Sequence, residues 1–269
     1  MNRTSRIWRW VGIASAVSTL LLLAGFVYAV SDIIEPSAEA GKLAANPARS
    51  EPAAQAGAWD VTAIGDSLAK GTGDDTGSGF ARRTVDLLNK EGQGATSKLV
   101  NNLGINGLTT EELMPMLDDP GVKYALQQAG IILLSIGGND LFNGTEALTA
   151  GEQVPAQAEI DAAIDESSAN FEKVVAQIKK INVQALLVYV GLYNPFSDLE
   201  GMREIGNDAV ARWNAMAMST LGKYEGTLVV PTYDLFTQNS PRYLSSDHFH
   251  PNGDGYQAIA ERMVQGIAR

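Results

Sequence analysis

The stretch DVTAIGDSL (Asp60 to Leu68) joins a predicted strand to a turn that contains a serine. Residues 60–65 are mainly apolar and end in glycine, as a short strand before a turn does. Gly, Asp and Ser are also the residues that turns and helix caps use for backbone reasons. The stretch alone therefore leaves open whether Ser67 is a reactive nucleophile or an ordinary turn serine, and the rest of the chain must decide.

Short apolar segments alternate with helix-like segments along the rest of the chain. After residues 60–65, the strand candidates are residues 97–102, 130–137, 184–190 and 226–231. The expected helices are Gly79 to Lys90, Thr110 to Leu117, Gln157 to Ile181, Met202 to Tyr224 and Pro251 to Ala268. The strands from Ser97 onward lack strict alternation and are rich in Val, Leu and Ile, which is typical of a sheet covered on both faces. The pattern predicts a three-layer α/β fold with a mainly parallel sheet.

Composition excludes several classes of protein. The 269 residues are 45% hydrophobic and 19% charged, which suits a globular chain with one catalytic-sized domain. The formal net charge of −11 argues against a nucleic-acid partner, because phosphate contacts need clustered Lys and Arg. The chain has no cysteine, which excludes disulfides, a thiolate nucleophile and cysteine-ligated metal sites.

The N-terminus has the pattern of an export signal. Arg3, Arg6 and Arg9 precede an uncharged stretch, residues 11–30, that is long enough to cross about 30 Å of hydrocarbon. The apolar stretch exceeds the ~7–15 residues usual in a signal peptide, which favours an uncleaved signal anchor over cleavage after Ala29. The positive end should stay in the cytoplasm, so both alternatives place the rest of the chain outside.

Three parts of the chain are therefore expected. Residues 1–30 are a signal anchor or signal peptide, residues 31–57 are a flexible Ala, Pro, Glu and Ser-rich tether, and residues 58–269 are the catalytic domain.

Four loops at the ends of predicted strands carry distinctive residues. They are GDSL (65–68), NNLGINGLTT (101–110), SIGGND (135–140) and SSDHFHPNGDGY (245–256). Ligands of parallel α/β folds bind beyond the carboxyl ends of the strands, so all four loops are expected at one edge of the sheet.

A serine hydroxyl needs a base to become a nucleophile, and the base needs a third group to orient it. The chain has only two histidines, His248 and His250. Asp247 lies three residues before His250, and on a tight turn this spacing can bring the carboxylate to one imidazole nitrogen while the other faces Ser67. This reasoning favours His250 as the base and leaves His248 as a substrate-side or packing residue.

Attack on an ester also needs donors for the oxyanion that forms. The candidates are the N–H of Ser67, an N–H from the glycine loop after the second strand, and the side-chain amide of Asn139. Gly permits close backbone approach, and Asn supplies N–H donors without adding charge.

Together these residues resemble a known family. IGDSL, GINGLTT, GGND and DHFHPN look like the four ordered blocks of the SGNH hydrolases, or GDSL lipases and esterases, and extend over residues 61 to 258. The resemblance implies a flavodoxin-like α/β/α sandwich. It also implies a catalytic triad of Ser67, Asp247 and His250, with an oxyanion hole formed by Ser67, Gly107 and Asn139. The anchor, together with GLYNPF (191–196), is similar to a membrane-anchored, lipase-like subgroup from Gram-positive bacteria.

Other interpretations of the same residues fit less well. The glycine-rich residues 71–79 match neither G-x-G-x-x-G nor a P-loop, and Asp74 and Asp75 would repel phosphate, so we expect a mobile loop there. Asp and His also bind zinc, but the chain has no H-E-x-x-H pattern and no distant histidine to complete a site, so no metal and no other cofactor is expected.

The expected function is serine-dependent hydrolysis of carboxylic esters outside the cytoplasmic membrane, through an acyl-enzyme. The expected substrate is a lipid or an acylated component of the cell envelope. Removal of acetyl groups from a carbohydrate, thioester hydrolysis, and an inactive domain that binds lipid or glycan remain alternatives. Residues 143–157 are expected to form a loop over the site that influences substrate range.

Overall fold

The computed structural model of the chain describes residues 10, 12–13, 15–24, 58–91, 96–142 and 157–267. The chain divides into two compact units, Met1–Ala54 and Gln55–Arg269. In the first unit the described residues are helical. Within the described ranges, no helix is both long enough and apolar enough to span a bilayer.

Several sequence predictions fall on residues outside the described ranges. They are the arginines before the apolar stretch, the cleavage position at Ala29, the tether at residues 31–57 and residues 143–156 of the predicted loop. The signal anchor and the three-part division of the chain therefore remain predictions.

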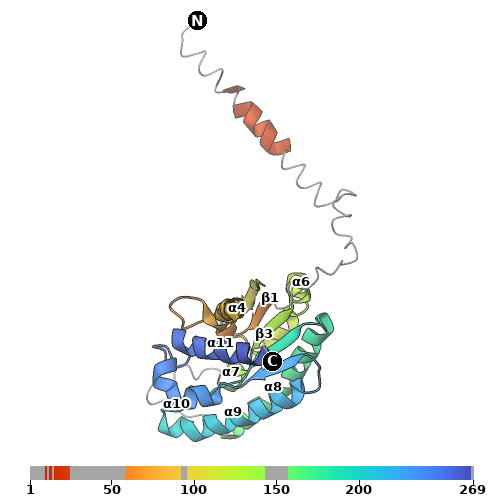
Figure 1. The fold of residues 1–269 in the computed structure, drawn as a ribbon. Helices are drawn as coiled ribbons and strands as arrows, with labels where there is room; N and C mark the ends of the chain where they lie inside the picture. Colours follow the sequence, from red (N-terminus) through yellow and green to blue (C-terminus); the bar gives the residue numbers. More distant parts are fainter. Residues whose placement is uncertain are drawn as a thin grey trace. The chain divides into compact units, whose positions relative to one another are not determined.

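Five parallel strands form the sheet of the second unit, in the order β2-β1-β3-β4-β5 (Figure 1). The strands are β1 (Asp60–Gly65), β2 (Lys98–Gly104), β3 (Ile131–Ser135), β4 (Leu186–Val190) and β5 (Thr227–Val230). This is the flavodoxin-like order, and the predicted parallel α/β fold is confirmed. In this order the chain moves outward from β1 to β2 and then returns to the other side of β1, so β1 and β3 flank the switch point where such folds bind ligands.

Helices cover both faces of the sheet. Among the described residues of the second unit, the helices longer than four residues are α4 (Gly79–Glu91), α5 (Thr110–Met116), α6 (Pro120–Gln128), α7 (Gly138–Phe142), α8 (Gln157–Ile181), α9 (Glu200–Leu221), α10 (Tyr233–Tyr243) and α11 (Gly253–Ile267). Apolar side chains of α4, α10 and α11 share one core cluster with the sheet, and those of α5, α6, α8 and α9 share another. In Figure 1, α4 and α11 accordingly lie on the side of the sheet away from α8 and α9.

The position of the central strand β3 explains why its sequence is continuously apolar. Ile131 and Leu133 contact one core cluster, whereas Ile132 and Leu134 contact the other, and all four are fully buried. Full burial of such a side chain contributes roughly 1.5–3 kcal/mol. A strand with helices on both faces therefore needs no polar face.

The edge strand β2 departs from this pattern. Its side chains alternate between exposed and partly buried, and Val100 is 49% exposed. The expectation that this strand is covered on both faces was wrong, because β2 lies at the end of the sheet.

The predicted long helices are present with shifts of up to three residues at their ends, and α8 has the predicted bounds. Four short helices were not predicted: α3 (Ser67–Lys70), α6, α7 and α10. The N-terminus of α6 could have been predicted from the sequence, because Asp119 is its N-cap residue and Pro120 is its first residue. α3 has only four residues, too few to show a helical period.

Candidate active site

A sharp turn at the end of β1 presents Ser67. Gly65 has φ +132°, and a Cβ at this position would lie 1.8 Å from the carbonyl oxygen of Ser135, so a side chain is excluded. The Asp66 carboxylate then caps α3 by accepting a hydrogen bond of 3.0 Å from the N–H of Leu68. Ser67 is the first residue of α3, where a backbone N–H has no acceptor within its own helix.

The structure brings the three predicted triad residues together. His250 Nε2 lies 2.8 Å from Ser67 Oγ, although the two residues are 183 positions apart in sequence. His250 Nδ1 lies 2.7 Å from Asp247 Oδ2. Both distances are within hydrogen-bonding range, so a proton can pass from the hydroxyl to an imidazole that a carboxylate orients.

The loop before α11 holds Asp247 in place. Asp247 Oδ1 accepts bonds of 2.9 Å from the N–H groups of Phe249 and His250, and one of 2.6 Å from the Ser245 hydroxyl. Burial alone would raise the pKa of this carboxyl, but these bonds and the one from the imidazole outweigh it and hold the pKa at about 2. Asp247 therefore stays ionised across the neutral range.

His248 takes a different role from His250. It is exposed, and its φ of +55° is the only positive value of a non-glycine residue within the described ranges. Its N–H donates to the carbonyl of Ser245, which closes a turn. The left-handed conformation of His248 thus turns the chain so that the next two N–H groups reach Asp247.

Two tyrosines outside the predicted site hold its loops. The Tyr193 hydroxyl donates to the carbonyl of Phe249 at 2.7 Å, directly before His250. The Tyr256 hydroxyl donates to the carbonyl of Thr72 at 2.7 Å, just after α3. Tyr193 belongs to the GLYNPF segment, which the sequence marked as distinctive without indicating this contact.

The glycine-rich residues 71–79 differ from the mobile loop that we expected. The Asp74 carboxylate accepts hydrogen bonds from Thr76, from the N–H of Gly79 and from Arg83, with the Arg83 Nη2 to Asp74 Oδ2 distance at 2.9 Å. These bonds tie the loop to α4. Glycine is also needed within it, because a Cβ at Gly73 would lie 2.8 Å from the Cβ of His250.

Asn139 lies at the start of α7, beyond the end of β3. It is buried, and its side-chain Nδ2 donates to the carbonyl of Leu108 at 2.9 Å. An amide nitrogen carries two N–H donors, so this bond orients the group and leaves a second donor. The neighbouring Asp140 carboxylate accepts the N–H and the hydroxyl of Thr110, which joins α7 to the start of α5.

The two glycines of the loop after β2 have different surroundings. A Cβ at Gly104 would lie 2.2 Å from the backbone nitrogen of Lys70, so Gly104 allows β2 to pack against α3. Gly107 is exposed, has φ +77° and has open space where a Cβ would project. Gly107 is therefore the glycine of this loop whose backbone is accessible to a ligand, and its role in the oxyanion hole remains a prediction.

A small polar hollow adjoins Asn139. Its volume is about 260 Å³, and it is lined by Thr109, Glu111, Asn139, Asp140, Ala163, Glu166, Ser167 and Asn170. The lining contains hydroxyl, amide and carboxyl groups and no basic residue. Such a surface suits a hydroxyl-rich or cationic group better than a phosphate.

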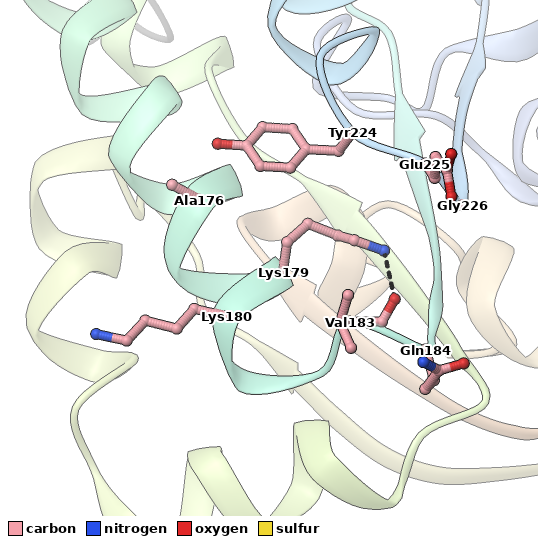
Figure 2. Close-up of a pocket in the computed structure, with 8 residues that line it drawn as sticks. All are labelled: Ala176, Lys179, Lys180, Val183, Gln184, Tyr224, Glu225 and Gly226. Atoms are coloured by element: carbon pink, nitrogen blue, oxygen red, sulfur yellow. Dashed lines mark hydrogen bonds between the residues drawn. The ribbon is translucent and has the colours of Figure 1, made fainter.

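A larger hollow of about 550 Å³ lies at the opposite edge of the sheet, between the end of α8 and the starts of β4 and β5 (Figure 2). Lys179 is buried there, and its ammonium donates to the carbonyls of Val183 and Ala185 at 3.1 Å each. Figure 2 shows Lys180 pointing away from the Lys179 ammonium. The polar groups do not converge on the hollow, so its size does not make it the active site.

No group of three or more His, Asp or Glu side chains is arranged to hold a metal ion in the part of the chain that the structure describes. The expectation that the reaction needs no metal remains a prediction.

The flavodoxin-like fold and this arrangement of serine, histidine and aspartate are those of a serine hydrolase of the SGNH type. The sequence profile of the GDSL-like Lipase/Acylhydrolase family matches residues 63–258. The chain belongs to this family, and it is a hydrolase that acts on esters.

Individual relatives agree with this assignment. The chain is 34% identical over 212 residues to the uncharacterized protein YpmR of Bacillus subtilis (strain 168), an alignment that covers 78% of this chain and 81% of the relative. It is 26% identical over 204 residues to the spore germination lipase LipC of Bacillus licheniformis, covering 75% and 93%. A solved structure, the lipase Lip_vut3 from a goat rumen metagenome, superposes with a TM-score of 0.65 and 25% identity, covering 76% of this chain and 94% of that one.

Proposed function

We propose that the chain cleaves carboxylic esters through an acyl-enzyme formed on Ser67. The observation that carries this proposal is the continuous hydrogen-bonded path from Ser67 Oγ to His250 Nε2 and from His250 Nδ1 to Asp247, at 2.8 and 2.7 Å. His250 takes the hydroxyl proton as Ser67 Oγ bonds to the carbonyl carbon, and then gives that proton to the leaving alcohol as the ester C–O bond breaks. His250 then takes a proton from water as the water bonds to the acyl carbon, and gives that proton to Ser67 Oγ as the acyl–serine bond breaks. This step releases the acid and restores the serine.

The oxyanion of each tetrahedral intermediate would be bound by the N–H groups of Ser67 and Gly107 and the side-chain amide of Asn139. Three features support these roles. Ser67 begins a helix, Gly107 is open to solvent, and Asn139 is buried and oriented by Leu108.

Activity is proposed to fall as the pH drops from 8 to 5, because a protonated imidazole is unable to accept the serine proton. Asp247 does not cause this fall, since its pKa of about 2 keeps it ionised over the whole interval. A rate that stays constant from pH 5 to 8 would contradict His250 as the base.

The proposed substrate is a lipid or an acylated envelope component, met outside the cytoplasmic membrane by an anchored enzyme. The support is the uncharged stretch at residues 11–30 behind three arginines, together with the similarity to a protein named as a spore germination lipase. The membrane-anchored, Gram-positive subgroup is part of this proposal.

A second candidate function is removal of acetyl groups from a carbohydrate. The polar hollow beside Asn139 favours it, because hydroxyl, amide and carboxyl groups can bond the hydroxyls of a sugar. A series of p-nitrophenyl esters from two to sixteen carbons distinguishes the candidates. The lipid proposal expects kcat/KM to rise by about tenfold or more between the two-carbon and the eight-carbon ester, because each buried methylene contributes about 0.8 kcal/mol. A preference for the acetyl ester would favour the carbohydrate esterase instead.

The catalytic mechanism is tested by labelling the purified full-length chain with a fluorophosphonate probe, which reacts with activated serines. Wild type is expected to be labelled with and without excess chelator, and Ser67→Ala is expected to remain unlabelled while retaining the wild-type circular dichroism spectrum. Labelling of Ser67→Ala would place the nucleophile elsewhere. An unlabelled, folded wild type would exclude the serine mechanism. Loss of labelling in chelator would show that the reaction needs a metal ion.

A further inference from the structure

Asp66 is a buried carboxyl group beside the nucleophile that has no step in the proposed mechanism. It is 2% exposed and lies between the last residue of β1 and the first residue of α3, directly before Ser67. Burying a carboxyl group is costly unless hydrogen bonds or a nearby charge compensate, so its contacts indicate what it does.

Asp66 is joined to β3 through a single residue, Ser135. The Ser135 hydroxyl donates to Asp66 Oδ1 at 2.7 Å, and the N–H of Asp66 donates to the carbonyl of Ser135 at 2.9 Å. The same Oδ1 accepts the N–H of Leu68. One carboxylate oxygen thus links the end of β3 to the first turn of the nucleophile helix.

This link matters because α3 is too short to be rigid by itself. A four-residue helix is far below the ~12–15 residues at which an isolated helix becomes marginally stable. The position of Ser67 relative to His250 therefore depends on what holds the ends of α3. Asp66 and Ser135 hold the first end, and Gly71, in a left-handed conformation, ends the helix.

The charge of Asp66 depends on pH. Burial raises its pKa to about 6, opposed by the bonds from Ser135 and Leu68 and by the charge of His250. Asp66 is therefore a carboxylate above about pH 6 and gains a proton below it.

Three tyrosines interact electrostatically with Asp66, from β4, the segment after β4 and α11. Burial raises their pKa values, so they stay neutral: Tyr189, Tyr193 and Tyr256. Asp247 is ionised throughout, and Asp74 has a lowered pKa and is paired with Arg83.

We propose that Asp66 and Ser135 form a positioning pair for the nucleophile, in which the carboxylate held by Ser135 anchors the start of α3 and thereby the position of Ser67. This inference rests on the proposed function, since it assigns residues that act through Ser67. Both are positioning residues and neither contacts the ester.

The pH dependence of the effect follows from the Asp66 carboxyl, which gains a proton as the pH falls through about 6. A neutral carboxyl accepts hydrogen bonds more weakly than a carboxylate does, so wild type loses the anchor at low pH. Asp66→Asn lacks the charged anchor at every pH, so its labelling rate should lie below that of wild type above pH 6 and approach it below pH 6.

The experiment measures the rate of fluorophosphonate labelling of the full-length chain from pH 4.5 to 8.5. The variants are wild type, Asp66→Asn, Ser135→Ala, the double variant and Asp75→Asn. Asparagine is close to aspartate in size, so Asp66→Asn removes the charge and weakens the bonds from Leu68 and Ser135 without leaving a cavity. Asp75→Asn is the matched control, because it removes the same charge from an exposed position on the neighbouring loop.

In Asp66→Asn we expect the labelling rate to be about tenfold below that of wild type at pH 8.5 and within about twofold of it at pH 4.5. Ser135→Ala should lower the labelling rate at pH 8.5 about three- to tenfold. The double variant should match Asp66→Asn within about twofold, because Ser135 acts through Asp66. Asp75→Asn should match wild type in both respects.

Three results would overturn the inference. One is a ratio of wild-type to Asp66→Asn labelling rates that stays constant from pH 4.5 to 8.5, which would leave a structural role only. Another is a labelling rate in the double variant that is reduced by the product of the two factors found in the single variants. If Asp66→Asn fails to fold, a wild-type labelling rate in Ser135→Ala would equally reject the pair. An unlabelled wild type would instead reject the serine mechanism, so the two failures are distinguishable.

Discussion

Replacing His250 with alanine is expected to lower kcat for ester hydrolysis by about 10⁴- to 10⁶-fold, the range found when the base of such a triad is removed. The reason is that Ser67 Oγ has the imidazole Nε2 as its acceptor at 2.8 Å, and without it the hydroxyl has no group to take its proton. Steady-state kinetics with a soluble ester measure the effect. Fluorophosphonate labelling should be lost in parallel, because the probe needs the same activated serine.

The second histidine of the chain supplies the control for this prediction. His248 is exposed and has φ +55°, a conformation that asparagine tolerates. His248→Asn should therefore keep the turn and retain activity within about threefold, because the turn needs the backbone of this residue and not its exposed imidazole. Similar losses in His250→Ala and His248→Asn would indicate that the loop, rather than the base, had been disrupted.

Replacing Asn139 with alanine is expected to lower kcat by about 10²- to 10³-fold with little change in KM, because an oxyanion donor acts on charge that exists only in the transition state. The buried position of Asn139 and its bond to the carbonyl of Leu108 support such a fixed donor. Asn139→Asp should lose at least as much activity, because a carboxylate near the oxyanion repels it.

Asn106 offers a control on the adjacent glycine loop. Its side-chain oxygen accepts a hydrogen bond from Thr72 at 2.8 Å, and the residue is exposed. Asn106→Ala should change kcat by less than about threefold, as expected for an exposed side chain. If Asn139→Ala lowered kcat by less than about tenfold, or if Asn139→Ala and Asn106→Ala lowered kcat equally, Asn139 would not be part of the oxyanion hole.

Comparison of the predicted and observed elements shows where sequence reasoning works. The buried strands and the long helix α8 were predicted because their apolar pattern extends over many residues. The helices α3 and α7 were missed because they have four and five residues, shorter than a readable period. The loop at residues 71–79 was expected to be mobile, since its composition gave no sign that Asp74 would pair with Arg83 on α4.

Some functional contacts had no signal in the sequence. Ser135 lay within a distinctive block, yet nothing in that block indicated that its hydroxyl would reach Asp66, 69 residues earlier. Tyr193 likewise reaches the carbonyl of Phe249 across 56 residues. Such bonds depend on which strands are neighbours, and a single sequence does not specify strand order.

The sequence by itself determined the parts of the site that depend on local backbone chemistry. The glycine that ends β1 at residue 65 marks the turn before Ser67, and the spacing of Asp247 and His250 lets a single turn join carboxylate to imidazole. Only the tertiary structure brought Ser67 to His250 and gave Asp66 its partner on β3. The physical reason is that these contacts follow from the packing of five strands in the order β2-β1-β3-β4-β5, which places the ends of β1 and β3 side by side at the switch point of the sheet.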